Sequence, residues 1–172
     1  MTGTKRLVAL GAVLALALWA AASAYATKPT RESYVIPPTD FPAGAACEFP
    51  LRVTADVNTQ HQTTFLDKEG NPARAVITGR LIITLTNLDE PDRSISLRLG
   101  DAIHITFNAD GSETHADTGR SVLILFPTDS PPGPSTNLYT GRLTFTISPT
   151  GDFTVTGVNG KAPAELCAAL SG

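Results

Sequence analysis

The stretch from Ala75 to Thr86, AVITGRLIITLT, decides the fold class of this chain. Its apolar residues recur at every second position, and threonine and arginine fill most positions between them. A period of two is typical of a β-strand with one face in the core and the other in solvent. The stretch therefore predicts one long, half-buried strand.

The same alternation recurs along the chain and is interrupted by short clusters of glycine, proline, asparagine and aspartate. Further strands are predicted at 49–57, 95–99, 103–107, 122–126, 143–147 and 153–155. Short connections between alternating strands indicate antiparallel neighbours. We predict an all-β fold, an antiparallel β-barrel or sandwich of about eight strands. A short C-terminal helix follows, with Pro163 in its first turn and Leu166 and Leu170 on one face.

The N-terminus has the three parts of a secretory signal peptide. Lys5 and Arg6 precede an apolar run over 7–22, and Ala24-Tyr25-Ala26 supplies the small residues of a cleavage site. A second site ends two residues earlier, at Ala24. The sequence predicts a signal peptide over 1–26, a proline-rich extended arm over 27–46 and a single β domain over 47–172. The arm is either a linker or a segment that lies across the domain.

Composition and charge limit the partners of the mature protein. Cleavage removes two basic residues and no acid, which takes the formal net charge from −3 to −5. An acidic chain without a basic run is not expected to bind nucleic acid. No later segment has the length of a membrane span, and no cysteine is placed to carry a lipid, so we expect a secreted protein without stable membrane anchoring.

Cys47 and Cys167 are the two cysteines of the chain. In an oxidising compartment two cysteines tend to pair, so the sequence predicts a Cys47–Cys167 disulfide. The bridge would tie the terminal helix to the start of the first strand, and it would leave no thiol for catalysis.

A short repeat bears on the shape of the sheet. Residues 78–84, TGRLIIT, and 140–146, TGRLTFT, match at five of seven positions, and the tripeptide TGR returns at 118–120. Strand parity places its glycines on the core face and its arginines on the polar face. Glycine in a strand marks a sharp bend or a close approach. Gly79, Gly119 and Gly141 are therefore either kinks that let long strands coil or the floor of a ligand cavity.

The search for catalytic motifs leaves only histidine. A four-residue turn over 108–111 would place His104 directly opposite His115, on one face with Glu113 and Asp117. Two imidazoles and a carboxylate are suited to a divalent metal or to acid and base steps. The other interpretation is a solvated pair on the outer face. No metal or other cofactor is predicted.

Val122 to Phe126, VLILF, is apolar on both faces and must be covered on both. The terminal helix, the proline-rich arm and a second subunit are the candidates for its outer cover, and the last would make a dimer. The proline-rich segment 127–136 that follows is predicted to form a stiff flap at the rim.

With these features the chain resembles small exported bacterial β-rich proteins of unknown function, through the signal peptide, the cysteine pair and the segments 78–81 and 138–142. Its strand pattern is distantly similar to lipocalin-like and to dirigent or allene oxide cyclase-like barrels. The likeness implies ligand binding or isomerase-type chemistry.

Three functions follow as expectations. The first is non-catalytic binding of a small apolar or amphipathic molecule, or of an extracellular partner protein, by a secreted barrel. The second is an isomerase or cyclase that uses His104 and His115 as acid and base. The third is a surface-interaction or adhesive protein, which predicts a filled interior and a flat exposed threonine or VLILF face.

Overall fold

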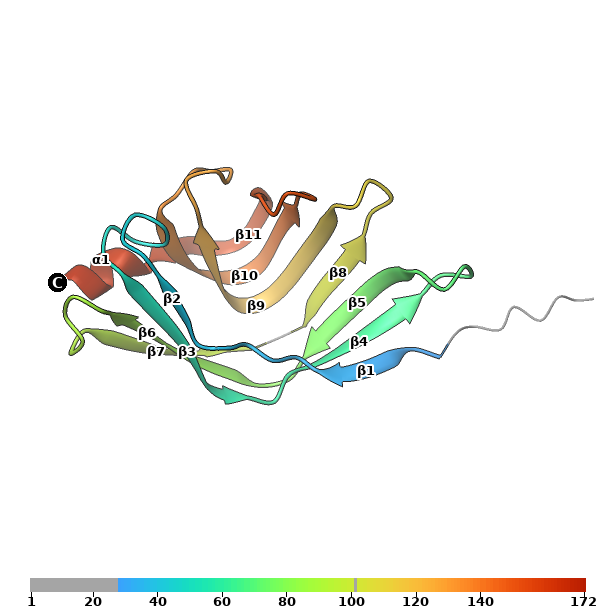
Figure 1. Ribbon diagram of the computed structural model, residues 1–172, viewed down its shortest axis with the longest axis horizontal. Coiled ribbons are helices and arrows are strands. Elements are labelled where there is room, and N and C mark those ends of the chain that lie inside the picture. The colour runs from blue at the N-terminus through green and yellow to red at the C-terminus, as the bar shows by residue number, and fades with distance from the viewer. Residues whose placement is uncertain (1–27, 101) are drawn as a thin grey trace, which may run out of the picture.

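The computed structural model describes residues 28–100 and 102–172, which form two antiparallel sheets and one short helix (Figure 1). The larger sheet has the order β1-β4-β5-β8-β9-β10-β11, and the smaller has the order β2-β3-β6-β7. The elements are β1 (Thr30–Ser33), β2 (Thr39–Phe41), β3 (Leu51–Asn58), β4 (His61–Leu66), β5 (Pro72–Thr78), β6 (Leu81–Asn87), β7 (Ser94–Leu99), β8 (Ile103–Phe107), β9 (Glu113–Leu125), β10 (Ser135–Ile147), β11 (Phe153–Glu165) and α1 (Leu166–Ser171). The predicted all-β, antiparallel architecture with a C-terminal helix is confirmed.

The predicted closed barrel is wrong, and a sandwich of two sheets describes the fold better. Closure requires the first and last strands of a sheet to pair. Here β1 and β11 lie at opposite ends of the larger sheet. Long stretches of chain bend and continue from one sheet into the other. The strand number is eleven instead of the expected eight or so, because the arm adds β1 and β2, β4 was not expected, and the predicted strand 75–85 is divided into β5 and β6.

Three stretches of chain cross from one sheet to the other: β3 continues into β4, β5 into β6, and β7 into β8. The predicted strand 75–85 is one of them, and it is divided at Gly79. This glycine has φ +136°, and a Cβ there would collide with the carbonyl oxygen of Thr59, which lies between β3 and β4. Only glycine suits a bend of this kind.

The proline-rich arm lies across the domain and contributes one edge strand to each sheet. β1 pairs with β4, and β2 pairs with β3. Its prolines stand outside both strands, as expected for segments that make ladder hydrogen bonds. Asp40 of β2 also accepts two 2.7 Å hydrogen bonds from Arg52 of β3.

The main core lies between the smaller sheet, α1 and the ends of β9 and β10 that are next to the segment joining these two strands. Val122 and Ile124 pack there against residues such as Leu81 and Leu85. Leu123 and Leu125, on the opposite face of β9, belong to a second cluster with Tyr139, Leu143 and Phe145. Both faces of the VLILF strand are thus covered within one chain, and its burial does not require a second subunit. Dimer formation stays a prediction.

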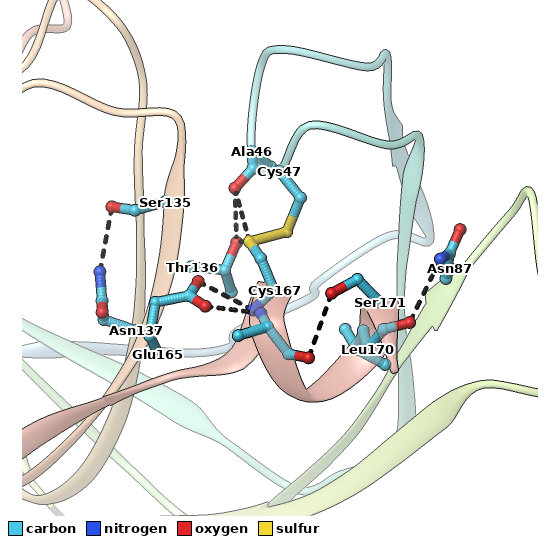
Figure 2. The surroundings of a disulfide bond; sticks show 11 residues. Ala46, Cys47, Asn87, Ser135, Thr136, Asn137, Glu165, Cys167, Leu170 and Ser171 are labelled. Carbon is cyan, nitrogen blue, oxygen red and sulfur yellow. Dashed lines mark hydrogen bonds between the residues drawn. A yellow bond between two sulfur atoms is a disulfide. The ribbon is translucent and has the colours of Figure 1, made fainter.

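The disulfide between Cys47 and Cys167 is present, as predicted, with a Cα–Cα distance of 5.6 Å (Figure 2). It joins the segment before β3 to α1. The helix begins at Leu166, where the Glu165 carboxylate accepts hydrogen bonds from the backbone N–H groups of Cys167 and Ala168, at 2.8 and 2.6 Å.

Pro163 does not start the helix, which corrects the expectation from its sequence. It lies in β11, which is an edge strand, at an irregularity in the pairing with β10. An edge strand tolerates a residue without an N–H group.

The predicted signal peptide lies outside the described residues. Within 28–100 and 102–172, no helix is long and apolar enough to cross a membrane.

Candidate functional site

The register of the β8–β9 hairpin decides which residues face inward. Ile105 pairs with His115, and His104 pairs with Ala116. The predicted pairing of His104 with His115 is therefore wrong. The turn runs to Ser112, one residue further than expected, and closes with a 2.9 Å hydrogen bond from the Asn108 N–H to the Ser112 carbonyl. A slip of one residue moves every side chain of a strand to the other face.

The two histidines consequently lie on opposite faces of the sheet. His104 is exposed, whereas His115 faces inward with Glu113 and Asp117. The structure brings together two of the three residues suggested for a metal or for acid–base chemistry, His115 and Glu113, and separates His104 from them. The described part of the chain contains no cluster of three histidine, cysteine or acidic residues placed to hold a metal ion.

His115 is held in one orientation. Its Nε2 atom lies 2.8 Å from Oε2 of Glu113, and its ring stacks on Phe145 of β10 with 4.8 Å between the centroids. The side chain is only 13% exposed. These contacts fix the imidazole at the wall of an apolar cleft.

This cleft consists of two adjoining cavities, of about 190 and 380 Å³. Tyr34, Ile103, Asp117 and Val122 line both. Most of the remaining wall is apolar, and it is contributed by Ile36, Phe41, Ile77, Leu81, Leu99, Leu123, Ile124, Phe126, Phe145, Ile147 and Phe153. The combined space lies in the range of small-molecule sites.

Asp117 is the ionisable group at the junction of the two cavities, and it is only 7% exposed. Burial raises the pKa of its carboxyl group above the usual range. A hydrogen bond from Ser121 and the charge of His115 oppose this pKa shift without cancelling it. Its Oδ1 atom has no hydrogen-bond partner among the described residues.

Gln60 supplies a second acceptor of the same kind. It lies at the bend between β3 and β4, is 4% exposed and lines the smaller cavity. Its backbone is fixed on both sides: its N–H donates to Asn58 Oδ1 at 2.9 Å, and its carbonyl accepts from the N–H of Tyr34 at 3.0 Å. Its side-chain Oε1, like Asp117 Oδ1, has no partner in residues 28–100 and 102–172.

The three glycines suggested as a cavity floor lie along the bend of the sheet. Gly119 pairs with Gly141, and Gly141 also pairs with Gly160 on β11. A Cβ at Gly141 would collide with the carbonyl oxygen of Asn159. Neither Gly119 nor Gly141 is among the residues that line the cleft. Gly79 lines a third hollow, which shares Leu99, Gly100 and Arg120 with the smaller cavity of the cleft. The geometry favours the interpretation of these glycines as bends with close backbone approach.

The rim segment after β9 is fastened to the larger sheet. The Asp129 carboxylate accepts hydrogen bonds from the backbone N–H groups of Phe126 and Phe153, at 2.6 and 2.8 Å. Ser130 forms a parallel bridge with Thr154 of β11. The segment thus holds Phe126 in the wall of the cleft. The Asp129 carboxylate fixes the backbone of Phe126 relative to that of Phe153.

Sequence reasoning missed Asp117, Gln60 and Tyr34 as cleft residues. Asp117 shares its strand face with His115, so the correct hairpin register would have placed it inside. Nothing in the local sequence around Gln60 or Tyr34 indicates that an arm residue and a bend residue meet.

The chain matches no protein-family model, and no characterised protein or solved structure is significantly similar to it. The resemblance to exported β-rich proteins and to lipocalin-like or dirigent-like barrels therefore stays a prediction.

Proposed function

We propose that this protein binds a small amphipathic molecule in the cleft between β8, β9 and the arm. One observation carries the proposal: Asp117 Oδ1 and Gln60 Oε1 are buried acceptors without a partner among residues 28–100 and 102–172, in a cleft whose wall is mostly apolar. Leaving a buried polar group without a hydrogen bond costs about 1–3 kcal/mol. A bound molecule that supplies donors would remove this cost.

The unpartnered atoms define the polar end of the ligand. Both are oxygens, so the ligand group that faces them is a hydrogen-bond donor, such as a hydroxyl or an amine. The aliphatic and aromatic wall favours an apolar body. The cleft also favours binding over the adhesive alternative, which requires a filled interior.

Two isosteric probes test the proposal. 1-Octanol can donate a hydrogen bond, whereas heptyl methyl ether, with the same number of heavy atoms, can only accept one. We expect 1-octanol to shift the backbone amide NMR signals of Ile103, Asp117 and Val122 saturably, with at least about fivefold higher affinity than the ether. Absence of saturable shifts at these residues up to the solubility limit would overturn the proposal.

A matched pair of variants locates the binding. Val122→Phe narrows both cavities, because Val122 lines both. Val158→Phe makes the same change at an exposed position on β11. The first variant should abolish 1-octanol binding, and the second should leave it unchanged. Equal affinities for the two variants would contradict binding in the cleft.

A second candidate function is proton transfer by Asp117. The observation that favours it is the raised pKa of a carboxyl group that faces an apolar cleft, two residues from His115 on the same strand face. His104 has no part in this version, because it lies on the other face. Incubation with 2-octanone in D2O tests it: Asp117-dependent loss of the α-proton signals supports catalysis, and identical rates with Asp117→Asn exclude it.

We further propose that the protein is exported. The buried disulfide is compatible with an oxidising compartment. Recovery of the processed chain outside the cytoplasm, with an N-terminus after Ala24 or Ala26, would test this.

A further inference from the structure

Three arginines surround one exposed hollow beside the bend of the sheet. Arg80, Arg98 and Arg120 line this space of about 610 Å³, together with Thr78 and the bend glycines Gly79 and Gly100. All three arginine side chains are exposed. They come from three different parts of the chain, so only the tertiary structure brings them together.

The strand register accounts for the convergence. Arg98 pairs with Ile82 and Leu99 with Leu81, so Arg80, which directly precedes β6, is a diagonal neighbour of Arg98 at the end of the β6–β7 ladder. An isolated bridge between Gly100 and Arg120 then brings β9 to the same point.

The charges in this hollow are not balanced by neighbouring acids. Among the described residues, no carboxylate lines it, and none of the three guanidinium groups takes part in a salt bridge. By contrast, Arg52 and Arg93 each contact a carboxylate, at 2.7 and 2.6 Å. The chain as a whole is acidic, with a net charge of −3. Like charges held close together repel each other, and a bound anion relieves that repulsion.

We infer that the arginine hollow binds the phosphate or sulfate group of a larger molecule. Guanidinium groups bind oxyanions through paired N–H donors, and three of them around one space suit a tetrahedral anion better than a two-oxygen carboxylate. With about 610 Å³, the hollow leaves room beside the anion for an organic group attached to it. This site does not depend on the function proposed for the cleft.

Four probes distinguish an anionic group attached to an organic molecule from a free anion: glucose 6-phosphate, glucose 6-sulfate, inorganic phosphate and glucose. Binding is followed by the amide NMR signals of Gly79 and Gly100 at low ionic strength, with the oxidised chain. The expected result is saturable binding of the two sugar esters, weaker binding of inorganic phosphate and none of glucose. Equal affinity for inorganic phosphate and glucose 6-phosphate would overturn the inference that the anion is part of a larger molecule. If neither bound, the inference of an anion site in this hollow would be overturned.

Arg142→Gln is the matched control for the arginines. Arg142 is exposed and follows a bend glycine in the same Thr-Gly-Arg motif, but it does not line the hollow. Arg98→Gln should weaken sugar phosphate binding by roughly tenfold or more, and Arg142→Gln, which removes the same single charge, by less than about twofold. Equal losses would indicate a general effect of net charge and overturn the site. Thermal unfolding of each variant shows that the fold is retained.

Discussion

Gly119 lies directly opposite Gly141 in the β9–β10 ladder. Both have positive φ, and the next pair along the sheet, Gly141 with Gly160, continues the row. Two strands of 13 residues thus bend at the same level. Both strands belong to the larger sheet along their whole length, and the shared bend lets Val122, Ile124 and Leu138 pack on the core of the smaller sheet.

Substitution of a bend glycine should be strongly destabilising. At Gly141, with φ +123°, an alanine Cβ would collide with the Asn159 carbonyl oxygen. We expect Gly141→Ala to lower the free energy of unfolding by about 2 kcal/mol or more. Gly157→Ala is the control, because its Cβ would meet only Thr144 Cβ, at 3.9 Å. Urea unfolding that gives equal effects would contradict the proposed role of the bend.

Removal of the disulfide should destabilise the domain by about 4 kcal/mol. The bridge joins residues 120 positions apart and therefore restricts most of the unfolded chain. The double variant Cys47→Ala, Cys167→Ala is compared with the oxidised wild type by urea unfolding, and the reduced wild type should match the variant. A loss below about 1 kcal/mol would show that packing of Leu166 and Leu170 alone holds the helix.

Asp117 should make stability decrease as the pH rises. Burial raises the pKa of its carboxyl group in the folded state, so the unfolded state releases the proton at lower pH. The contribution of Asp117 to the free energy of unfolding is fully present below the unfolded-state pKa of about 3.9. This contribution is lost as the pH rises through the folded-state pKa. Relative to Asp117→Asn, the wild type should therefore lose stability between acidic and neutral pH, as measured by urea unfolding across that range.

Asp110 provides a control of opposite sign. Hydrogen bonds from the Ser112 side chain and backbone lower the pKa of its carboxyl group. Its stabilising effect is present above the unfolded-state pKa and is lost as the pH falls through the folded-state pKa. Asp110→Asn should thus reduce stability at neutral pH and have little effect in strong acid. The same pH dependence of stability for Asp110→Asn and Asp117→Asn would contradict the opposite pKa shifts of the two carboxyl groups.

The rim segment should detach when Asp129 is replaced. Asp129 is 6% exposed and accepts hydrogen bonds from two backbone N–H groups. We expect Asp129→Ala to cost about 2–3 kcal/mol and to open residues 127–134 to limited proteolysis. Asp129→Asn keeps one acceptor oxygen and should fall between wild type and alanine. An unchanged cleavage pattern would show that the prolines hold the segment without the carboxylate.

The expectations that depended on local pattern agree best with the structure. Alternation at 75–85 predicted one long half-buried strand, and the structure has two half-buried strands there, β5 and β6, divided at Gly79. The spacing of Leu166 and Leu170 predicted the buried face of the helix. The pairing of Cys47 with Cys167 was also predicted, because no other cysteine competes. His104 is exposed, as expected of the outer face, but its pairing with His115 was predicted wrongly. One additional turn residue, Ser112, reverses the face of His115 and of every residue that follows.

The sequence by itself determined the strand-rich composition of the fold, the glycine-rich and proline-rich breaks between strands, and the disulfide, because each depends on residue type and local spacing. The tertiary structure decided that the sheets stay open, that Asp117, Gln60 and Tyr34 meet in one cleft, and that Arg80, Arg98 and Arg120 surround one hollow. These arrangements depend on register and on the bends at glycine, which join residues far apart in the chain. Alternation specifies which residues share a face, but it does not specify which distant face they meet.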